Sequence, residues 1–390
     1  MPIKALMIVH SYYPSDPRVR REAEALSARG DKVDVICLRE DKDKKYETVG
    51  GVNIYRLPVK RHRGSGFLVY LSEYIAFFML ASFKTLFLYF KNRYHVIQVH
   101  TIPDFLVFCA FIPKLFGAKI ILDMHEVMPE FFMYRYNLSQ KHLLTRMVKL
   151  QERLSTKLAN RIITVSDTLK DILVSRGVRP EKITVIMNVP DDNIFNIERA
   201  AKSNDKKEFV ISYHGLISDI YDLSIVLESL ALIRDRVPAI RFIVIGKGPQ
   251  ENYYKERAEK LGLSNIVQFC GHMPQEKVVI ALKDIDVGIV PLVSNDFSEL
   301  AFPTKVVEYV IMKIPVITAD CKTIRKYFDN NSLCFYKQND TNALADKICE
   351  LYQEEQMRNN FVRNASECYD KINWGKMKDR YYGLLEKIIN

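Results

Sequence analysis

Paired cysteines are missing from this sequence. Its seven cysteines, at positions 37, 109, 270, 321, 334, 349 and 368, include no CxxC pair, and their number is odd. This pattern excludes a disulfide framework and a zinc site built from paired cysteines, and it is typical of proteins in a reducing compartment. A secretory leader is not expected either, because the amino-terminal apolar run is short and ends at His10. We therefore predict a cytoplasmic protein.

Signatures of nucleic-acid binding are missing too. The sequence contains no zinc finger, basic zipper or RNP-type motif, which argues against nucleic acid as a partner. The net charge is nevertheless +10 and is unevenly placed: residues 1–190 hold 30 Lys and Arg against 18 Asp and Glu, whereas residues 191–390 hold 27 against 29. A one-sided positive field attracts a polyanion or an anionic membrane face. We predict that the amino-terminal half contacts an anionic membrane surface.

Long apolar runs are scarce, and residues 67–90 are the one membrane candidate. Glu73 and Lys84 interrupt this stretch, and sheet strands are predicted on both sides of it, so a transmembrane span is disfavoured. A helix buried against the sheet and a helix lying at a membrane surface both remain open. The flanking basic residues suit acidic headgroups: Lys60, Arg61, Arg63, Lys91 and Arg93. We expect a peripheral protein on the inner face of the membrane.

The rest of the chain alternates short apolar strands with amphipathic helices. Strands predicted at 5–9 and 33–38 flank a helix, and this order favours a parallel, doubly wound sheet. A chain of 390 residues has room for two cores. We predict an α/β protein of two Rossmann-like domains facing a cleft: a first domain at 1–190, a polar linker at 191–207, a second domain at 208–371, and a carboxyl-terminal helix at 372–390 that returns to the first domain.

The turn after the first strand is a predicted helix start. Asp16 is expected as the N-cap and Pro17 as the first residue of a helix that ends at Gly30. The first turn holds three arginines, where cations oppose the helix dipole: Arg18, Arg20 and Arg21. Either an anionic ligand neutralises their positive charge, or they pair with Glu22, Glu24 or a neighbouring loop.

A polar segment follows the strand predicted at 119–122. Open α/β sheets bind ligands just past the carboxyl ends of central strands. His125 is therefore the best candidate for a catalytic polar group in this half, since a histidine near neutral pH can donate to a phosphate or a sugar hydroxyl. A structural role, capping a loop carbonyl, is the alternative.

Three turns in the second half are candidate phosphate sites. Gly215 and the segment 246–249 each lie between a predicted strand and a predicted helix, where glycine lets the backbone approach a ligand. The segment 303–305 begins a helix whose N–H groups, together with Lys305, favour a phosphate. One turn later Glu308 offers acceptors to a vicinal diol such as a ribose. The simpler explanation is an ordinary amphipathic helix with solvated Lys305 and Glu308.

The order of these motifs resembles a GT-B glycosyltransferase of family 4, the group 1 type. The resemblance covers nearly the whole chain and rests on its motifs in this order: YYPSDPRVRREAEAL, PDFLVF, AKIILDMHEVMPE, YHGLI, VIGKGP, FCGHMP, DVGIVPL and PTKVVEYVIMKIPVI. It implies a nucleotide sugar bound in the second domain and an acceptor in the first. It also implies retention of anomeric configuration without a metal ion or other cofactor.

The resemblance also assigns roles to individual residues. The donor-binding residues it implies are Gly215, Lys247, Pro303, Thr304, Lys305 and Glu308, with Glu308 holding the ribose. The catalytic residues are His125, Lys305 and Glu299. The acceptor-side residues are Asp16, Arg18, Arg21 and Glu126.

The chain departs from the family pattern at three places. The family commonly has two glutamates separated by seven residues, but Leu300 stands where the first is expected, and Glu299 lies one residue early. The Arg and Lys that usually follow the first glycine turn have no counterpart, so Lys247, Lys305 or an arginine of the segment 18–21 is expected to substitute. The glycine pair of the first loop is replaced by Ser15 to Arg18.

These observations predict a retaining hexosyltransferase. The expected donor is a UDP- or GDP-sugar, and the expected acceptor is a glycan, such as one linked to a polyprenyl diphosphate, in cell-surface polysaccharide synthesis. The missing Arg and Lys keep a second hypothesis open, in which the chain is a non-catalytic partner subunit of the same fold. A sugar-nucleotide epimerase is a third hypothesis, and it requires carboxylates placed for proton transfer or elimination.

Overall fold

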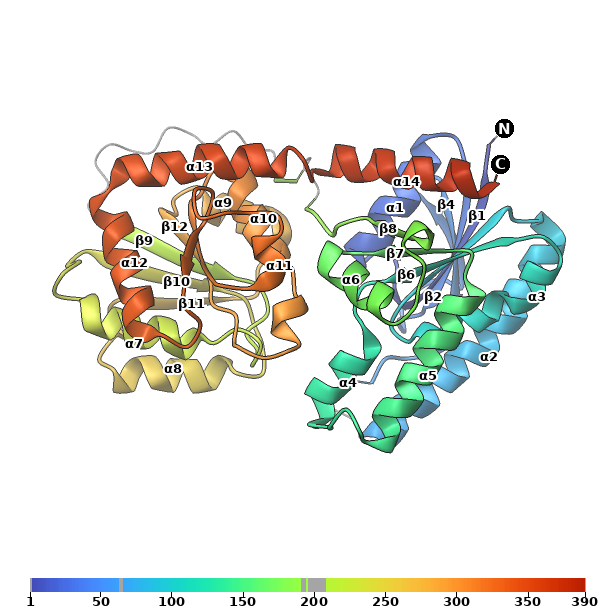
Figure 1. Cartoon of the computed structure of the whole chain (residues 1–390), viewed down its shortest axis with the longest axis horizontal. Coiled ribbons are helices and arrows are strands. Elements are labelled where there is room, and N and C mark those ends of the chain that lie inside the picture. Colours follow the sequence, from blue (N-terminus) through green and yellow to red (C-terminus); the bar gives the residue numbers. More distant parts are fainter. Residues whose placement is uncertain (1, 63–65, 191–193, 196–207, 390) are drawn as a thin grey trace. The chain divides into compact units, whose positions relative to one another are not determined.

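The computed structural model describes residues 2–62, 66–190, 194–195 and 208–389 (Figure 1). The chain divides into two compact units: the first unit is Met1–Asn188 with Met377–Asn390, and the second unit is Val189–Lys376. Each unit has a predominantly parallel sheet covered by helices, so the predicted α/β class with two Rossmann-like domains is confirmed. Most of the predicted linker, 191–207, lies outside the described residues.

The first unit is built on an eight-stranded sheet in the order β3-β4-β2-β1-β5-β6-β7-β8. Its strands are β1 (Lys4–Tyr12), β2 (Lys32–Leu38), β3 (Tyr46–Val49), β4 (Val52–Leu57), β5 (Val96–His100), β6 (Lys119–Met124), β7 (Arg161–Thr164) and β8 (Ile183–Val185). All pairings are parallel except β3 with β4, which form an antiparallel hairpin at one edge. The sheet therefore has the doubly wound form that the first strand, helix and strand predict.

Helices and short 3₁₀ segments surround this sheet. They are α1 (Pro17–Ala28), α2 (Phe67–Asn92), η1 (Asp104–Ala110), α3 (Phe111–Leu115), α4 (Met128–Tyr136), α5 (Leu143–Leu158), α6 (Asp167–Ser175), η2 (Pro180–Lys182) and α14 (Trp374–Ile389). The 3₁₀ segment η1 leads directly into the short helix α3. Helix α14 packs on the first unit, where the Tyr382 hydroxyl donates to the Ala25 carbonyl at 2.8 Å.

The second unit has a six-stranded parallel sheet in the order β11-β10-β9-β12-β13-β14. Its strands are β9 (Phe209–His214), β10 (Ile240–Ile245), β11 (Val267–Gly271), β12 (Val287–Val290), β13 (Val316–Ala319) and β14 (Cys334–Tyr336). Its helices are α7 (Leu223–Ile233), α8 (Glu251–Lys260), α9 (Gln275–Leu282), η3 (Ser298–Leu300), α10 (Thr304–Ile311), α11 (Lys322–Arg325), α12 (Thr341–Gln353) and α13 (Glu355–Tyr369).

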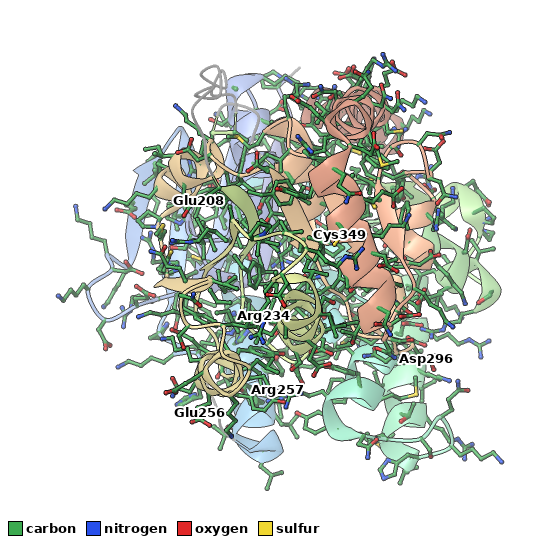
Figure 2. All side chains as sticks on the ribbon, turned by 90° about the vertical axis from the view of Figure 1, so that its left-hand side faces the viewer. Glu208, Arg234, Glu256, Arg257, Asp296 and Cys349 are labelled. Atoms are coloured by element: carbon green, nitrogen blue, oxygen red, sulfur yellow. The ribbon has the colours of Figure 1, made fainter. Side chains whose placement is uncertain are left out.

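In the second unit, most charged side chains lie at the surface and most apolar side chains lie inside, as expected for a globular domain. Glu208, Arg234 and Glu256 lie at the surface, whereas Cys349 on α12 is buried (Figure 2). All seven cysteines of the chain lie in the described residues, and none forms a disulfide. The prediction that the cysteines build no disulfide framework is therefore confirmed.

Helix α2 is apolar on both of its faces. Phe77 and Ala81 are fully buried, while Phe83 and Phe87 are exposed. Among the described helices, α2 is the one long and apolar enough to cross a membrane by length and composition, and 28% of its most apolar window is buried. Its contacts with β1, β2 and β4 place the inner face on the sheet. The outer face leaves a large apolar surface that the sheet does not use.

The acidic residue of α2, Glu73, contacts a histidine of the sheet beneath the helix. Glu73 is buried, lies 3.0 Å from Nε2 of His10 at the end of β1, and accepts a hydrogen bond from the His62 backbone at 2.8 Å. Burial lowers the pKa of His10 to about 3, so its imidazole is neutral at physiological pH. The carboxylate therefore fixes α2 to the carboxyl end of β1.

Both sheets have a point where the strand order reverses. In the first sheet it falls between β1 and β5, and in the second between β9 and β12. Chain segments leave such a pair of strands in opposite directions, which opens a crevice at the carboxyl ends where open α/β sheets bind ligands. The predicted residues Asp16, Arg18 and Arg21 follow β1, and Gly215 follows β9, at these two points.

Candidate functional site

Three neighbouring strands of the second unit end in glycine. The turn after β9 begins at Gly215, the turn after β10 begins at Gly246, and β11 ends at Gly271. All three glycines have positive φ. The Gly215 N–H donates to the Ile245 carbonyl and the Gly246 N–H donates to the Gly271 carbonyl, each at 2.8 Å. A Cβ on Gly246 would lie 1.8 Å from the Gly215 carbonyl oxygen. Glycine at this position therefore permits the close packing of the first two turns.

Small-ligand pockets typically measure roughly 300–1,000 Å³, and the cavity above these strand ends measures about 520 Å³. It is lined by Phe195, His214, Gly215, Leu216, Ile245, Gly246, Lys247, His272, Met273, Pro274, Gln275, Val278 and Glu308. The structure thus brings three predicted donor-binding residues, Gly215, Lys247 and Glu308, to one cavity. Its wall at 272–275 directly follows β11.

Glu308 faces this cavity from helix α10. Its carboxylate is hydrogen-bonded to Nε2 of His214, and the His214 ring stands edge-on to Tyr309 at 4.6 Å between centroids. An ionised carboxylate has several acceptor positions, so one bond to His214 leaves others for a vicinal diol. His214 was not among the predicted site residues, although its place at the end of β9 could have indicated it.

Lys305 is held below the first glycine turn. Its ammonium donates to the Tyr213 hydroxyl at 3.1 Å and lies 3.2 Å from the centroid of the Tyr221 ring. A Cβ on Gly215 would lie 3.3 Å from Nζ, so the ammonium is adjacent to that turn. Burial lowers the pKa of Lys305 well below its ordinary value, although the negative charge of Glu308 opposes the shift.

The start of α10 agrees with the sequence prediction. Pro303 is the N-cap and carries no side-chain cap hydrogen bond, and the helix runs from Thr304 to Ile311. Val306, Val307 and Val310 are buried, as expected for its inner face, whereas Thr304 is exposed. The exposed amino end of a helix without a side-chain cap can receive an anion.

Glu299 occupies a different environment. It lies on η3, and its carboxylate accepts a hydrogen bond from the Lys322 backbone at 2.8 Å, which caps the start of α11. Glu299 is not among the residues that line the cavity beside Glu308. Its proposed contact with the donor sugar therefore stays a prediction.

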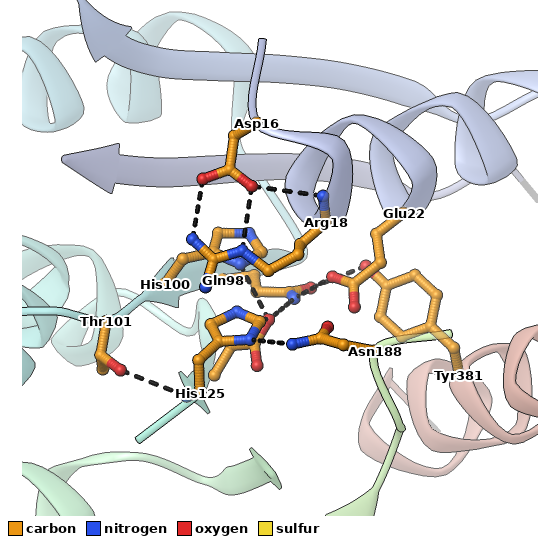
Figure 3. Close-up of polar contacts among 10 residues, drawn as sticks. Asp16, Arg18, Glu22, Gln98, His100, Thr101, His125, Asn188 and Tyr381 are labelled. Carbon is orange, nitrogen blue, oxygen red and sulfur yellow. Dashed lines mark hydrogen bonds and ion pairs between the residues drawn. The ribbon is translucent and has the colours of Figure 1, made fainter. Parts of the chain in front are cut away.

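A buried polar cluster occupies the reversal point of the first sheet (Figure 3). Its centre is Asp123 Oδ2, which lies 2.8 Å from Nδ1 of His100, 3.1 Å from Nε2 of Gln98 and 3.4 Å from Nε2 of His125. Asn188 contacts the other ring nitrogen of His125 at 3.2 Å. Asp123 on β6 and Asn188, which follows β8, thus hold His125 in one orientation from both sides of its ring.

Burial and charge act against each other within this cluster. Burial alone would raise the pKa of Asp123, but the neighbouring His125 and His100 hold it well below its ordinary value. Burial opposes protonation of His100, yet hydrogen bonding to Asp123 raises its pKa overall. Burial lowers the pKa of His125 despite the same carboxylate. Of the two imidazoles, His125 is therefore the one favoured in its neutral form.

The predicted acceptor-side residues surround this cluster. Asp16 is the N-cap of α1, accepting from the Arg18 backbone at 3.2 Å and from its guanidinium at 2.8 Å, and Pro17 is the first helical residue as predicted. Although burial opposes ionisation, Arg18 lowers the pKa of Asp16. Burial raises the pKa of Glu126, and the charge of Arg18 counters this. Arg21 is half-buried on the same helix.

The arginines of this first turn have partners inside the chain. Arg18 pairs with Asp16, and Arg20 pairs with Glu24 at 2.9 Å across one helical turn. Arg18 and Arg20 therefore pair with carboxylates of this chain, which is one of the two alternatives that the sequence left open. Arg18 remains partly exposed, so one side of its guanidinium faces outward.

His100, Asp123 and His125 also have the side chains of metal ligands. Their candidate ligand atoms lie within 4.8 Å of one another. Nδ1 of His100 and Nε2 of His125 both point at Asp123, so contacts within the chain account for their placement. Metal independence stays a prediction.

Models of known protein families match both halves of the chain. Residues 193–367 match the model described as glycosyl transferases group 1, and residues 15–188 match the model described as glycosyl transferase 4-like domain. Together the two matches span most of both units.

Two curated relatives are named for lipid-linked glycan acceptors. The chitobiosyldiphosphodolichol beta-mannosyltransferase of Candida albicans is 26% identical over 362 residues, 85% of this chain and 77% of that protein. The N,N'-diacetylbacillosaminyl-diphospho-undecaprenol alpha-1,3-N-acetylgalactosaminyltransferase of Campylobacter jejuni is 23% identical over 61% of this chain and 63% of that protein.

Solved structures of the same fold superpose on nearly all of the chain. Sucrose-phosphate synthase from Thermosynechococcus elongatus has a TM-score of 0.77 at 16% identity and covers 99% of both chains. HepE from Anabaena, in complex with UDP-glucose, has a TM-score of 0.71 at 15% identity and covers 99% of this chain and 100% of that one. At these identities the likeness shows the fold.

Proposed function

Because this chain belongs to the group 1 glycosyltransferases, of family 4 type and GT-B fold, we propose that it moves a hexosyl group from a UDP- or GDP-sugar to a glycan carried on a polyprenyl diphosphate. The cavity of the second unit supports the donor half of this proposal. Glu308 and His214 would hold the ribose, and the turn at Gly215 with the start of α10 would hold the diphosphate. The names of the two curated relatives support the acceptor half.

The position of Lys305 carries the proposal, because it supplies a cation beside the first glycine turn, after which this chain lacks the Arg and Lys of the family pattern. Its ammonium lies beside Gly215 and has no carboxylate within salt-bridge distance among the described residues. The barrier to sugar transfer lies largely in departure of the nucleoside diphosphate, so a fixed positive charge at the phosphates contributes most. Helix N–H groups and Lys305 would supply this stabilisation without a metal ion.

We further propose that transfer retains the anomeric configuration. Glu308 is the single carboxylate among the residues lining the donor cavity, and its assigned work is to bind the ribose. With no carboxylate there to attack the sugar, the acceptor hydroxyl enters on the face that the diphosphate leaves, and the leaving phosphate takes the acceptor proton. His125 and Glu126 of the first unit would position the acceptor hydroxyl. NMR assignment of the product anomer tests this step, and an inverted product overturns it.

A thermal-shift panel tests donor binding directly. We expect one of the UDP-, GDP- or ADP-sugars to raise the melting temperature, because a ligand that binds the native state at 100 times its Kd stabilises it by about 2.7 kcal/mol. The free nucleoside diphosphate should produce most of the shift. If no nucleotide sugar shifts the melting temperature at millimolar concentration, the proposed function is wrong.

Binding of the donor nucleotide should take up a proton. The pKa of Lys305 lies well below 10.5 without ligand, and a diphosphate beside its ammonium raises that pKa. At a pH between the two values the lysine is neutral before binding and charged afterwards. Calorimetry in two buffers with different ionisation enthalpies measures this uptake. Lys305→Met should abolish the uptake and weaken nucleotide binding at least tenfold, whereas Lys247→Met should keep the uptake.

We propose that the protein acts peripherally on the inner face of the cytoplasmic membrane. The outer side of α2 and α5 carries exposed apolar side chains, and the amino-terminal half carries the excess of basic residues. An apolar surface flanked by cations binds an anionic bilayer through both area and charge.

Liposome flotation tests this surface. The protein should float with vesicles containing phosphatidylglycerol more than with neutral vesicles, and less so at high salt because surface charges are screened. Phe83→Glu with Phe87→Glu should reduce flotation severalfold. Leu232→Glu, at an exposed leucine on α7 of the second unit, is the matched control and should leave flotation unchanged. Equal binding to neutral and anionic vesicles contradicts the charge contribution.

A further inference from the structure

A second apolar cavity lies in the first unit, apart from the polar cluster of Asp123. It measures about 350 Å³ and is enclosed by α2, α4, α5 and the segment that follows β5. Most of its lining is aromatic or aliphatic, including Tyr74, Phe105, Phe132, Leu144 and Val148. Its volume falls within the roughly 300–1,000 Å³ of small-ligand pockets. The sheet core does not fill it, and no residue assigned to the donor or the acceptor hydroxyl lines it.

Two cations stand among these apolar side chains. Arg61 and Arg135 line the cavity, both are exposed, and no aspartate or glutamate lines it. Within the described part of the chain neither guanidinium forms an ion pair with a carboxylate. An apolar cavity with unpaired arginines at its exposed side is complementary to a lipid that carries phosphate at one end, because arginine binds phosphate oxygens bidentately.

The cavity also adjoins the polar cluster through the chain itself. Thr101 contacts the backbone of His125, and the next two residues, Ile102 and Pro103, line the cavity. Past the end of the neighbouring strand β6, His125 belongs to the cluster, and Met128, the first residue of α4, lines the cavity. Residues that follow the carboxyl ends of β5 and β6 therefore contribute both to the polar cluster and to the wall of the apolar cavity.

The opening of the cavity is continuous with the exposed apolar surface. Leu144 and Met147 on α5 line it, and Leu143 and Leu150 on the same helix are exposed beside them. A helix that merely lies on a bilayer needs an apolar face but no cavity. The enclosed space, in contrast, would hold a lipid chain that leaves the bilayer at this face and enters the protein.

We propose that this cavity binds the first isoprene units of the acceptor lipid, with Arg61 and Arg135 on its diphosphate. The inference rests on the proposed function for the identity of the acceptor, but its ligand chemistry is separate from the donor site. A cavity of this size holds the diphosphate-proximal end of the chain and leaves the remainder in the membrane. It selects an isoprenoid by the branched shape of its first units.

Binding of farnesyl diphosphate to the full chain, without donor or glycan, tests the proposal by calorimetry. We expect farnesyl diphosphate to bind at least tenfold more tightly than inorganic diphosphate and severalfold more tightly than dodecyl diphosphate. Leu144→Trp, which fills the cavity, should weaken farnesyl diphosphate binding at least tenfold. Leu154→Trp, on the same helix outside the cavity lining, is the matched control and should bind as the wild type does.

The charged end is tested in the same way. Arg135→Ala should weaken farnesyl diphosphate binding several-fold and farnesol binding little, whereas Arg146→Ala, an exposed arginine on α5 outside the lining, should change neither. Equal binding by wild type, Leu144→Trp and Leu154→Trp overturns the cavity assignment, as does equal affinity for farnesyl and inorganic diphosphate. The thermal shift by nucleotide sugars in the same variants reports on the donor site, so failure of one proposal is distinguishable from failure of the other.

Discussion

Replacing Glu308 with alanine is expected to lower kcat/KM for the donor by on the order of 100-fold or more. The change removes the carboxylate that would accept hydrogen bonds from the ribose and also deprives His214 of its partner. Hydrogen bonds to charged groups contribute roughly 1.5–3 kcal/mol each, and about 1.4 kcal/mol corresponds to tenfold in affinity. Initial-rate kinetics with the donor identified by thermal shift measure the loss.

Two further variants separate ribose binding from other effects of the substitution. Glu308→Gln keeps the size and one acceptor oxygen but removes the charge, so its loss should be intermediate. Glu276→Ala removes an exposed glutamate from the first turn of α9, outside the cavity lining, and should leave kcat/KM unchanged. An unaltered kcat/KM in Glu308→Ala would show that the ribose does not bind at this carboxylate.

Gly246→Ala is expected to produce the largest loss of stability. The new Cβ would lie 1.8 Å from the Gly215 carbonyl oxygen and 2.9 Å from its carbon, and the residue has φ of +154°. Relief requires the turns after β9 and β10 to separate, which breaks the backbone packing beneath the donor cavity. We expect the unfolding free energy of the second unit to fall by on the order of 3 kcal/mol, measured by chemical denaturation.

A glycine without steric contacts provides the comparison. Gly383 lies in α14, and a Cβ added there meets no heavy atom within 4 Å. Gly383→Ala should therefore stabilise the helix by roughly 0.5–1 kcal/mol through its higher helix propensity. The idea of close turn packing fails if Gly246→Ala unfolds at the same denaturant concentration as the wild type.

Local patterns in the sequence predicted the framework of the donor cavity. Glycine turns between a strand and a helix, and a helix start one turn before Glu308, depend on neighbours in the chain and were visible without a structure. The environment of Lys305 was not visible, because Tyr213 and Tyr221 reach it only through the packing of α10 on β9. The His214 contact with Glu308 joins residues 94 apart for the same reason.

The hairpin of β3 and β4 could have been predicted from the two glycines of its turn. Gly50 and Gly51 connect the two strands, and both have positive φ, as a two-residue hairpin turn requires. The charged residues before Tyr46 conceal the alternation that follows. Helix α4 was missed because its aromatic residues, Phe131 and Phe132 among them, do not show a clear polar face; they line the apolar cavity instead.

Most of helix α14 belongs to the first unit but is translated after the whole second unit. The Tyr381 hydroxyl donates to Gln98 at 2.6 Å, and the amide of Gln98 donates in turn to Glu22 and to Asp123. All other members of this polar cluster lie at or before Asn188, so the whole second unit is translated before Tyr381 emerges from the ribosome. Domains generally fold as units, amino-terminal first. The first unit is therefore begun first and finished last, and its polar cluster is completed only after the whole second unit has been translated.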